Sequence, residues 1–262
     1  MSAIITSIYN CPVKSISFQN IDKCKINKNI GIEGDRVFAF SQNLDLDQSK
    51  EFEKIPEARK GKWNKIVTLK NTPVFNKYNF LYENNKLTLT IKDKEIITIN
   101  VNDSNERDNL VKKLIELEGS LKNDIRLMRN DEYPFYDTSI SNKSMFRNSI
   151  SLLNINSIKD FENKINQKIE KSIFRGNLYF DGIEAWEERN WIGKTIKIDD
   201  VLFKVEKNIP RCVAINLKPE TDDNSFNLLK TLKQTYDHYD MGVYLTPEND
   251  GEINLSEKIL IK

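Results

Sequence analysis

The sequence of 262 residues has few of the side chains from which many common active sites are built. It contains one histidine, His238, and three cysteines. A histidine-rich zinc site and a cysteine-ligated iron–sulfur cluster are therefore excluded. A Ser-His-Asp hydrolase would depend on His238 as its base, yet no G-x-S-x-G motif accompanies it. The sequence also lacks a Walker-type phosphate loop and a glycine-rich dinucleotide fingerprint.

Long hydrophobic runs and a charge imbalance are also absent. No run of 18 apolar residues occurs, so we expect no transmembrane helix. The first ten residues lack the basic and long apolar regions of a signal peptide. Forty basic and 39 acidic residues leave a net charge of +1, which gives no reason to expect a nucleic-acid or acidic-membrane partner. Three irregularly spaced cysteines do not form a disulfide framework, which favours a reducing compartment and a cytoplasmic protein.

The sequence is rich in patterns that are typical of strands. Residues 3–8 are β-branched and apolar, and residues 80–99 alternate in a way that predicts two strands. Residues 62–69 also read as a strand. Apolar residues at helical spacing predict helices over 108–118 and 157–166, the second with a serine N-cap. The sequence therefore predicts a β-rich α+β fold.

Residues 174–212 hold a first set of candidate site residues. Arg175 and Asn177 lie two apart in an alternating run, so they would share one face of a strand. Cys212 directly follows Arg211, and a neighbouring cation favours the thiolate, a soft metal donor. Together they indicate an anionic ligand held near a thiolate. Taken alone, Cys212 is also compatible with a buried apolar role, and the polar pair with an exposed strand edge.

A second set lies near the N-terminus, where turns meet strands. Lys14 and Ser15 follow Pro12 in a turn, and Arg36 follows Gly34 at the start of a short apolar strand. From spacing alone, Lys14 and Arg36 could equally be solvated surface cations.

The same segments resemble a known family. The phrases FRGN (174–177), AWEERNWIG (185–193) and RC (211–212), followed by residues 228–261, resemble the MOSC domain, the C-terminal domain of molybdenum cofactor sulfurases. The phrases CPVKSISF (11–18) and GIEGDRVFAF (31–40) are similar to the β-barrel domain that precedes MOSC in the amidoxime-reducing group. The resemblance implies an N-terminal MOSC-associated β-barrel domain with a small α/β piece over 1–130, and a MOSC β-barrel over 145–262.

The resemblance also implies a cofactor and its ligands. The cofactor would be the molybdenum cofactor, a molybdopterin carrying molybdenum, held in the crevice between the two domains; the wider family also carries an association with pyridoxal phosphate. Cys212 would be the protein ligand to molybdenum and the catalytic residue. The remaining matched positions would bind the pterin and its phosphate: Lys14, Ser15, Arg36, Ser149, Arg175, Asn177 and Arg211. Two departures are visible, Cys11 where members often have tyrosine and Gly176 where they usually have proline.

By this resemblance the protein would reduce N-hydroxylated compounds, such as amidoximes, hydroxylamines and N-hydroxylated bases, to amines. No motif for an iron–sulfur cluster, flavin or nicotinamide occurs, so electrons would come from a separate reductase, ferredoxin or cytochrome. Two alternatives remain open at this stage. Cys212 could carry a persulfide in a sulfur-carrier or cofactor-binding protein, or the chain could be an interaction module without a cofactor.

Overall fold

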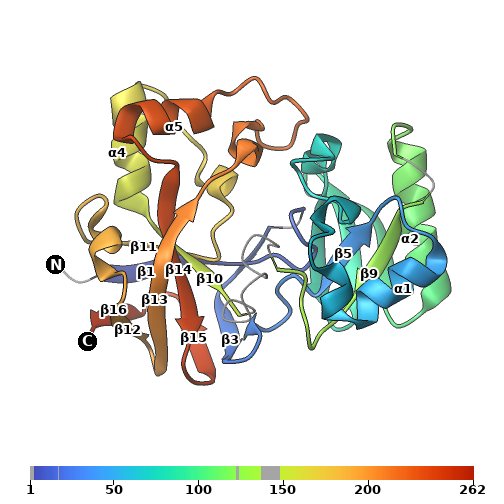
Figure 1. Cartoon of the computed structure of the whole chain (residues 1–262), viewed down its shortest axis with the longest axis horizontal. Helices are drawn as coiled ribbons and strands as arrows, with labels where there is room; N and C mark the ends of the chain where they lie inside the picture. Colours follow the sequence, from blue (N-terminus) through green and yellow to red (C-terminus); the bar gives the residue numbers. More distant parts are fainter. Residues whose placement is uncertain (1–2, 17, 122–123, 137–147) are drawn as a thin grey trace.

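The computed structural model describes residues 3–16, 18–121, 124–136 and 148–262. Figure 1 shows a barrel that carries both chain ends on its outer side, beside a smaller part that contains α1, α2, β5 and β9. The predicted β-rich α+β class is confirmed. Within the described residues, no helix is both long enough and apolar enough to span a bilayer.

The barrel closes through seven strands in the order β11-β10-β14-β13-β12-β16-β1, with β1 pairing back to β11. The strands are β1 (Ala3–Asn10), β10 (Ile150–Asn154), β11 (Leu178–Asp181), β12 (Thr195–Ile198), β13 (Val201–Pro210), β14 (Asp240–Pro247) and β16 (Lys258–Ile261). Alternate residues of β13 point inward and are buried, as half-buried strands require. Inside the barrel, Trp191 stacks on Phe180 with ring centroids 5.3 Å apart.

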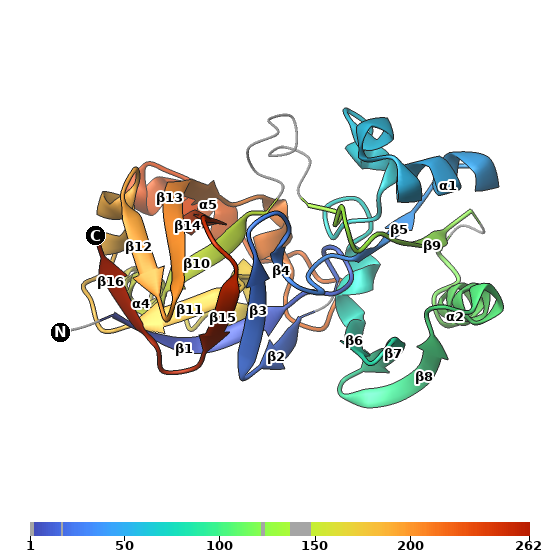
Figure 2. The ribbon, with the colours of Figure 1, turned by 90° about the horizontal axis from the view of Figure 1, so that it is seen from below.

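The strand pairing differs from the predicted division into two separate barrels. Strand β1 lies in the same closed sheet as the strands after residue 148, so the N-terminus completes the C-terminal barrel. Strand β2 (Gln19–Ile21) extends the barrel sheet beside β1, and the remaining described strands before residue 130 form small open sheets. In one of these sheets, β3 (Lys23–Asn27) pairs with β15 (Gly251–Asn254) and β4 (Gly31–Ile32). Figure 2 shows this linking sheet between the barrel and the smaller part.

Two helices, α4 (Ile155–Ile165) and α5 (Leu228–Tyr236), pack on the outside of the barrel (Figure 1). The N-cap of α4 is Asn154, whose side chain accepts from the Asn156 N–H at 3.0 Å, so the predicted serine cap is wrong. The Ser157 hydroxyl instead donates to the buried Glu188 carboxylate at 2.8 Å, and Asn154 also donates to Glu188, at 3.0 Å. Glu188 and Trp191 of the AWEERNWIG phrase therefore serve the packing of the barrel.

The smaller part contains a three-stranded meander, a two-stranded sheet and two helices. They are β6 (Asn79–Glu83), β7 (Lys86–Ile91), β8 (Lys94–Asn100), β5 (Phe38–Ser41), β9 (Arg126–Arg129), α1 (Leu46–Lys54) and α2 (Ser104–Leu117). Residues 80–99 hold three strands because Asn84 and Asn85 make a left-handed two-residue turn, with φ of 50° and 60°. The predicted helix over 108–118 is confirmed as α2, whereas residues 62–69 contain a short 3₁₀ helix, Trp63–Lys65, and no strand.

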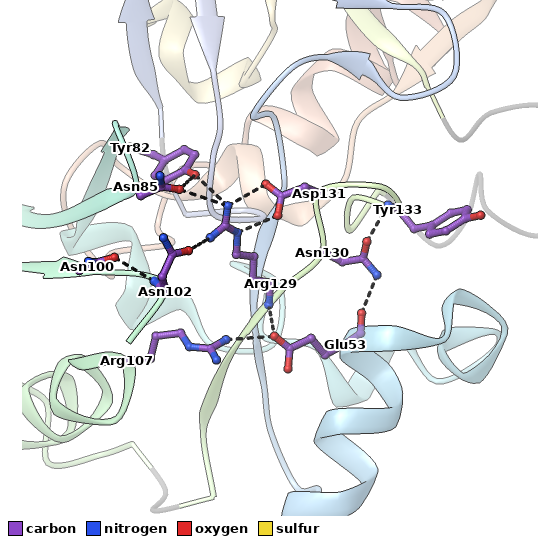
Figure 3. Close-up of polar contacts among 10 residues, drawn as sticks. All are labelled: Glu53, Tyr82, Asn85, Asn100, Asn102, Arg107, Arg129, Asn130, Asp131 and Tyr133. Atoms are coloured by element: carbon purple, nitrogen blue, oxygen red, sulfur yellow. Dashed lines mark hydrogen bonds and ion pairs between the residues drawn. The ribbon is translucent and has the colours of Figure 1, made fainter. Parts of the chain in front are cut away.

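A polar network centred on Glu53 and Arg129 fixes the smaller part (Figure 3). The Glu53 carboxylate accepts from Arg107 Nη1 at 3.0 Å and from the Arg129 N–H at 2.9 Å, which joins α1, α2 and β9. The Arg129 guanidinium donates to Asp131 at 2.7 Å and to Asn102 at 2.7 Å. These bonds fix the start of the segment that follows β9, which runs on to Tyr136 at the candidate site described below.

Candidate functional site

The predicted site residues meet at a cavity of about 160 Å³. Apart from Asn177, all of them line it: Lys14, Ser15, Arg36, Ser149, Arg175, Arg211 and Cys212. They come from the turn after β1, the turn before β5, the start of β10, the residue before Gly176 and the end of β13. The structure also adds residues that the resemblance did not assign, among them Cys11, Tyr136 and Tyr244.

Three of these residues have left-handed backbone conformations that are uncommon outside glycine. The φ angles are 63° at Ser15, 55° at Arg36 and 51° at Arg175. Such conformations cost free energy and persist where the surrounding structure enforces them, often at functional sites. The fold thus holds three strained residues around one cavity.

Arg175 does not lie on a strand, so the prediction that it shares a strand face with Asn177 is wrong. It ends the 3₁₀ helix η5 (Lys171–Phe174), and its N–H donates to the Ser172 carbonyl at 2.9 Å. Strand β11 begins only at Leu178. Because the backbone turns left-handed at Arg175, the side chains of Arg175 and Asn177 do not share one strand face.

Asn177 is fully buried behind the cavity wall. Its Oδ1 accepts from the Ser151 hydroxyl at 2.8 Å, and its Nδ2 donates to Asp35 Oδ1 at 3.2 Å. All of these contacts are within the protein, and the amide holds Asp35 in place.

Asp35 forms a buried pair with Arg36. Asp35 Oδ1 also accepts from the Cys11 N–H at 2.8 Å, and Asp35 Oδ2 accepts from Arg36 Nη1. Burial alone would lower the pKa of the Arg36 guanidinium, but the Asp35 carboxylate reverses this and raises it. The pair therefore fixes a permanent cation at the cavity, with its counter-charge behind the wall.

Arg211 lines the cavity but is largely committed to the backbone. Its Nε donates to the Met241 carbonyl at 3.0 Å, its Nη1 donates to the Phe174 carbonyl at 2.6 Å, and its Nη2 also donates to Met241. Arg211 thereby ties β14 to the end of η5. Burial lowers the pKa of both Arg211 and Arg175, although an arginine side chain remains charged at any working pH.

Two thiols line the same cavity. Cys212 is exposed and precedes the 3₁₀ helix η7 (Val213–Asn216). Cys11 is buried, and burial raises the pKa of its thiol to about 11, so Cys11 stays protonated at neutral pH. The place of Cys11 at the cavity could not be inferred from the sequence.

Tyr136 is the cavity residue that gave no signal in the sequence. Its hydroxyl is buried and has no hydrogen-bond partner among the described residues. Burial raises the pKa of this phenol, so it remains a donor. The Arg36 guanidinium lies 6.0 Å from its ring centroid. An unsatisfied buried donor costs about 1–3 kcal/mol, which a ligand atom in the cavity would recover.

The lining fits an anionic cofactor with a soft metal. Lys14, Arg36, Arg175 and Arg211 contribute positive charge, the Tyr136 hydroxyl is an unsatisfied donor, and Cys212 offers sulfur. Guanidinium and ammonium groups suit a phosphate, and thiolate suits a soft metal. Within the described ranges, no group of three or more histidine, cysteine or carboxylate side chains could hold a metal ion.

A comparison with known families finds one match in the C-terminal part of the chain. Residues 138–259, a little under half of the chain, match the MOSC domain. Its barrel is completed by β1, which lies outside the matched residues.

A comparison with curated proteins finds similarity to mitochondrial amidoxime reducing component 2 of Rattus norvegicus. The two are 33% identical over 72 residues, which is 28% of this chain and only 21% of that protein. Among solved structures, the YUAD protein from Bacillus subtilis covers all of this chain and 96% of its own at 10% identity, with a TM-score of 0.45. YiiM from Geobacillus stearothermophilus covers 43% of this chain and 53% of its own at 16% identity, with a TM-score of 0.35.

Proposed function

We propose that this protein is a molybdenum-cofactor-dependent oxidoreductase that reduces N-hydroxylated compounds to amines. The MOSC domain and the similarity to an amidoxime reducing component support the cofactor and the reaction class. The observation that carries the proposal is the exposed thiol of Cys212 in one cavity with Lys14, Arg36 and Arg175. A thiol and a set of cations are the groups that a phosphate-bearing metal cofactor needs.

In this proposal, charged side chains bind the phosphate of the cofactor and a sulfur atom binds its metal. Lys14 and Arg36 would bind the phosphate of the pterin, with Arg36 kept charged by Asp35. The Tyr136 hydroxyl would donate its unsatisfied hydrogen bond, and Cys212 would hold the metal through sulfur. When bound, the molybdenum centre supplies two-electron redox chemistry, which belongs to the cofactor.

The reaction determines that electrons and protons must reach the site together with the substrate. The N–O bond of the substrate breaks, and its oxygen leaves as water after uptake of two electrons and two protons. In the part of the chain that the structure describes, no cluster of candidate ligands could hold a second metal centre. We therefore assign electron delivery to a separate reductase, ferredoxin or cytochrome.

The proposal is tested by loading and assay. The protein is produced in a host that makes the cofactor, and molybdenum, pterin and pyridoxal phosphate are measured per chain. Near-stoichiometric molybdenum and pterin without pyridoxal phosphate are expected, together with reduction of benzamidoxime to benzamidine. Protein without molybdenum from such a host, folded by circular dichroism, would rule the proposal out.

A second candidate, a sulfur carrier, is favoured by the exposure of Cys212 at the cavity edge. There a persulfide sulfur on Cys212 would be delivered to an acceptor. Thiocyanate formed on treatment with cyanide from the wild type, and not from Cys212→Ala, together with no benzamidoxime reduction, would replace the first function by this one.

The electron donor gives a further prediction. We expect the purified, molybdenum-loaded protein to reduce benzamidoxime with a reduced viologen and to be inactive with NADH or NADPH alone, because the sequence has no nicotinamide or flavin motif. The assay compares product formation with each donor on the same preparation. Turnover driven by NADPH without added protein would contradict the need for a partner.

Arg175→Ala is expected to lower cofactor occupancy. The variant removes a cation that lines the cavity, and a charge-assisted hydrogen bond to a ligand is worth about 1.5–3 kcal/mol. Affinity for the pterin should fall by about 10- to 100-fold. Pterin per folded chain is measured beside Arg107→Ala, which removes an arginine of the Glu53 network instead. Equal occupancy in the wild type and Arg175→Ala would remove Arg175 from the site.

A further inference from the structure

A second cavity, of about 230 Å³, adjoins the first and has no role in the function proposed above. The two cavities share Ile173, Arg175 and Ala214 in their linings. The second is built from both parts of the protein, since Leu69, Tyr78 and Asp93 come from the smaller part and Glu170 and Glu220 from the MOSC domain. A ligand in it would lie next to Arg175, which lines the first cavity together with Cys212.

Contacts between the two parts hold this cavity in shape. Asn76 Nδ2 donates to the carbonyls of Lys218 and Thr221, both at 2.8 Å, and Lys77 pairs with Asp222 at 2.9 Å. The Asn79 side chain accepts from the Phe18 N–H at 2.8 Å. These contacts hold the walls of the cavity in a fixed arrangement, which suits a small-molecule site.

Part of its inner surface is apolar and aromatic. Leu69, Tyr78 and Leu217 line it and are almost fully buried. Phe18 also lines it and is half-buried, and its ring stacks on Tyr9 with centroids 4.1 Å apart and 18° between planes. The Tyr9 stack fixes the orientation of the Phe18 ring, and the Arg175 guanidinium lies over the same ring, 5.7 Å from its centroid.

Acidic side chains predominate in the lining of the second cavity, whereas basic side chains predominate in the first. Asp93, Glu170 and Glu220 line it, all exposed, against the single cation Arg175. Within the described residues, the carboxylates of Asp93 and Glu220 make no hydrogen bond and no ion pair. Both stand in turns with left-handed backbone, at φ of 61° and 57°. The second cavity thus offers two uncommitted carboxylates on short, fixed turns.

This balance excludes an extension of the anionic cofactor. A further phosphate or a nucleotide would enter a site with three carboxylates, and like charges in one site repel. A planar, apolar and positively charged ligand satisfies both the aromatic wall and the carboxylates.

We propose that the second cavity is a binding site for aromatic organic cations, such as arylamidines and arylalkylamines. Their flat body lies against Phe18 and Tyr78, and their charge faces Asp93 and Glu220. One part of the proposal rests on the proposed function: the cavity holds the non-reacting end of the substrate, and the N-hydroxylated end reaches past Arg175 towards Cys212. Cation binding itself does not depend on molybdenum.

The test compares two ligands of the same shape. Benzamidine is a cation at neutral pH, and benzamide is its neutral counterpart. Isothermal titration of the full chain, with and without bound pterin, should show benzamidine binding about five- to tenfold more tightly than benzamide, since exposed charge pairs are worth about 0.2–1 kcal/mol each. The preference should shrink in high salt because exposed pairs are screened.

Two variants separate charge from shape. In the double variant Asp93→Asn with Glu220→Gln, the preference should vanish while benzamide affinity stays unchanged; asparagine tolerates the left-handed turn. Phe18→Leu should weaken both ligands and leave their ratio intact. Asp200→Asn is the matched control, because its carboxylate is 88% exposed beside β12 and lines neither cavity.

Equal affinities in the wild type, or a preference that survives the double variant, would overturn the proposal. The outcome is independent of the enzyme activity. Benzamidine binding to a chain that never takes up molybdenum would leave the cation site standing and remove the proposed function. A molybdenum-loaded, active protein that does not prefer benzamidine over benzamide would leave the proposed function standing and remove the cation site.

Discussion

Cys212→Ala is expected to abolish reduction of benzamidoxime while leaving the pterin largely bound. Cys212 offers sulfur at the cavity, whereas the phosphate would be held by other residues, Lys14 and Arg36 among them. Loss of an outer partner of a metal ligand already costs about 10–100-fold in activity or affinity, so loss of the ligand itself should cost more than about 100-fold in rate. The measurement is viologen-driven turnover, normalised to pterin content.

Cys24→Ala is the matched control, because Cys24 is a buried thiol of the barrel and lines neither cavity. It should keep the wild-type rate per bound cofactor. Cys212→Ser keeps the size but offers a hard oxygen, so it should be nearly as inactive as Cys212→Ala. Wild-type turnover by Cys212→Ala would show that Cys212 is not the ligand, and loss of pterin from that variant would show that sulfur also anchors the cofactor.

The sequence predicted the residues of the first cavity better than it predicted their geometry. Lys14, Arg36 and Cys212 were selected from separate turns and strand ends, and the structure brings them to one cavity. That selection depended on the family resemblance, because from spacing alone each was also compatible with a surface or core role. Local pattern does not encode which turns meet in space.

The errors have local physical causes. The apolar alternation around Arg175 predicted a strand, but the chain makes a left-handed turn there. At Gly176 an added Cβ would lie 2.4 Å from Leu153 Cδ1, so this glycine allows close packing of η5 on β10, in addition to the freedom that glycine gives the backbone. The inward orientation of Asn177 could not be predicted, because the residues that it bonds to, Asp35 and Ser151, are distant in sequence. Tyr136 could not be found, since its segment has no period.

Asp35→Asn is expected to reduce both stability and cofactor occupancy, although Asp35 itself does not line the cavity. The asparagine oxygen can still accept from the Cys11 N–H and the Asn177 amide. Its NH₂ group would then face Arg36, which is also a donor, and leave the guanidinium without a counter-charge. Breaking a buried pair from one side costs about 3–5 kcal/mol, which should appear as a lower midpoint of urea unfolding.

A double-variant cycle separates the two effects. In Asp35→Asn with Arg36→Met the unpaired charge is gone, so much of the lost stability should return, as it does when both members of a buried pair are replaced. Pterin occupancy should not return, because the cation for the phosphate is missing. Asp200→Asn controls for loss of an exposed carboxylate. If the double variant binds pterin like the wild type, then Arg36 serves only to balance Asp35, and the phosphate must depend on Lys14 and Arg175.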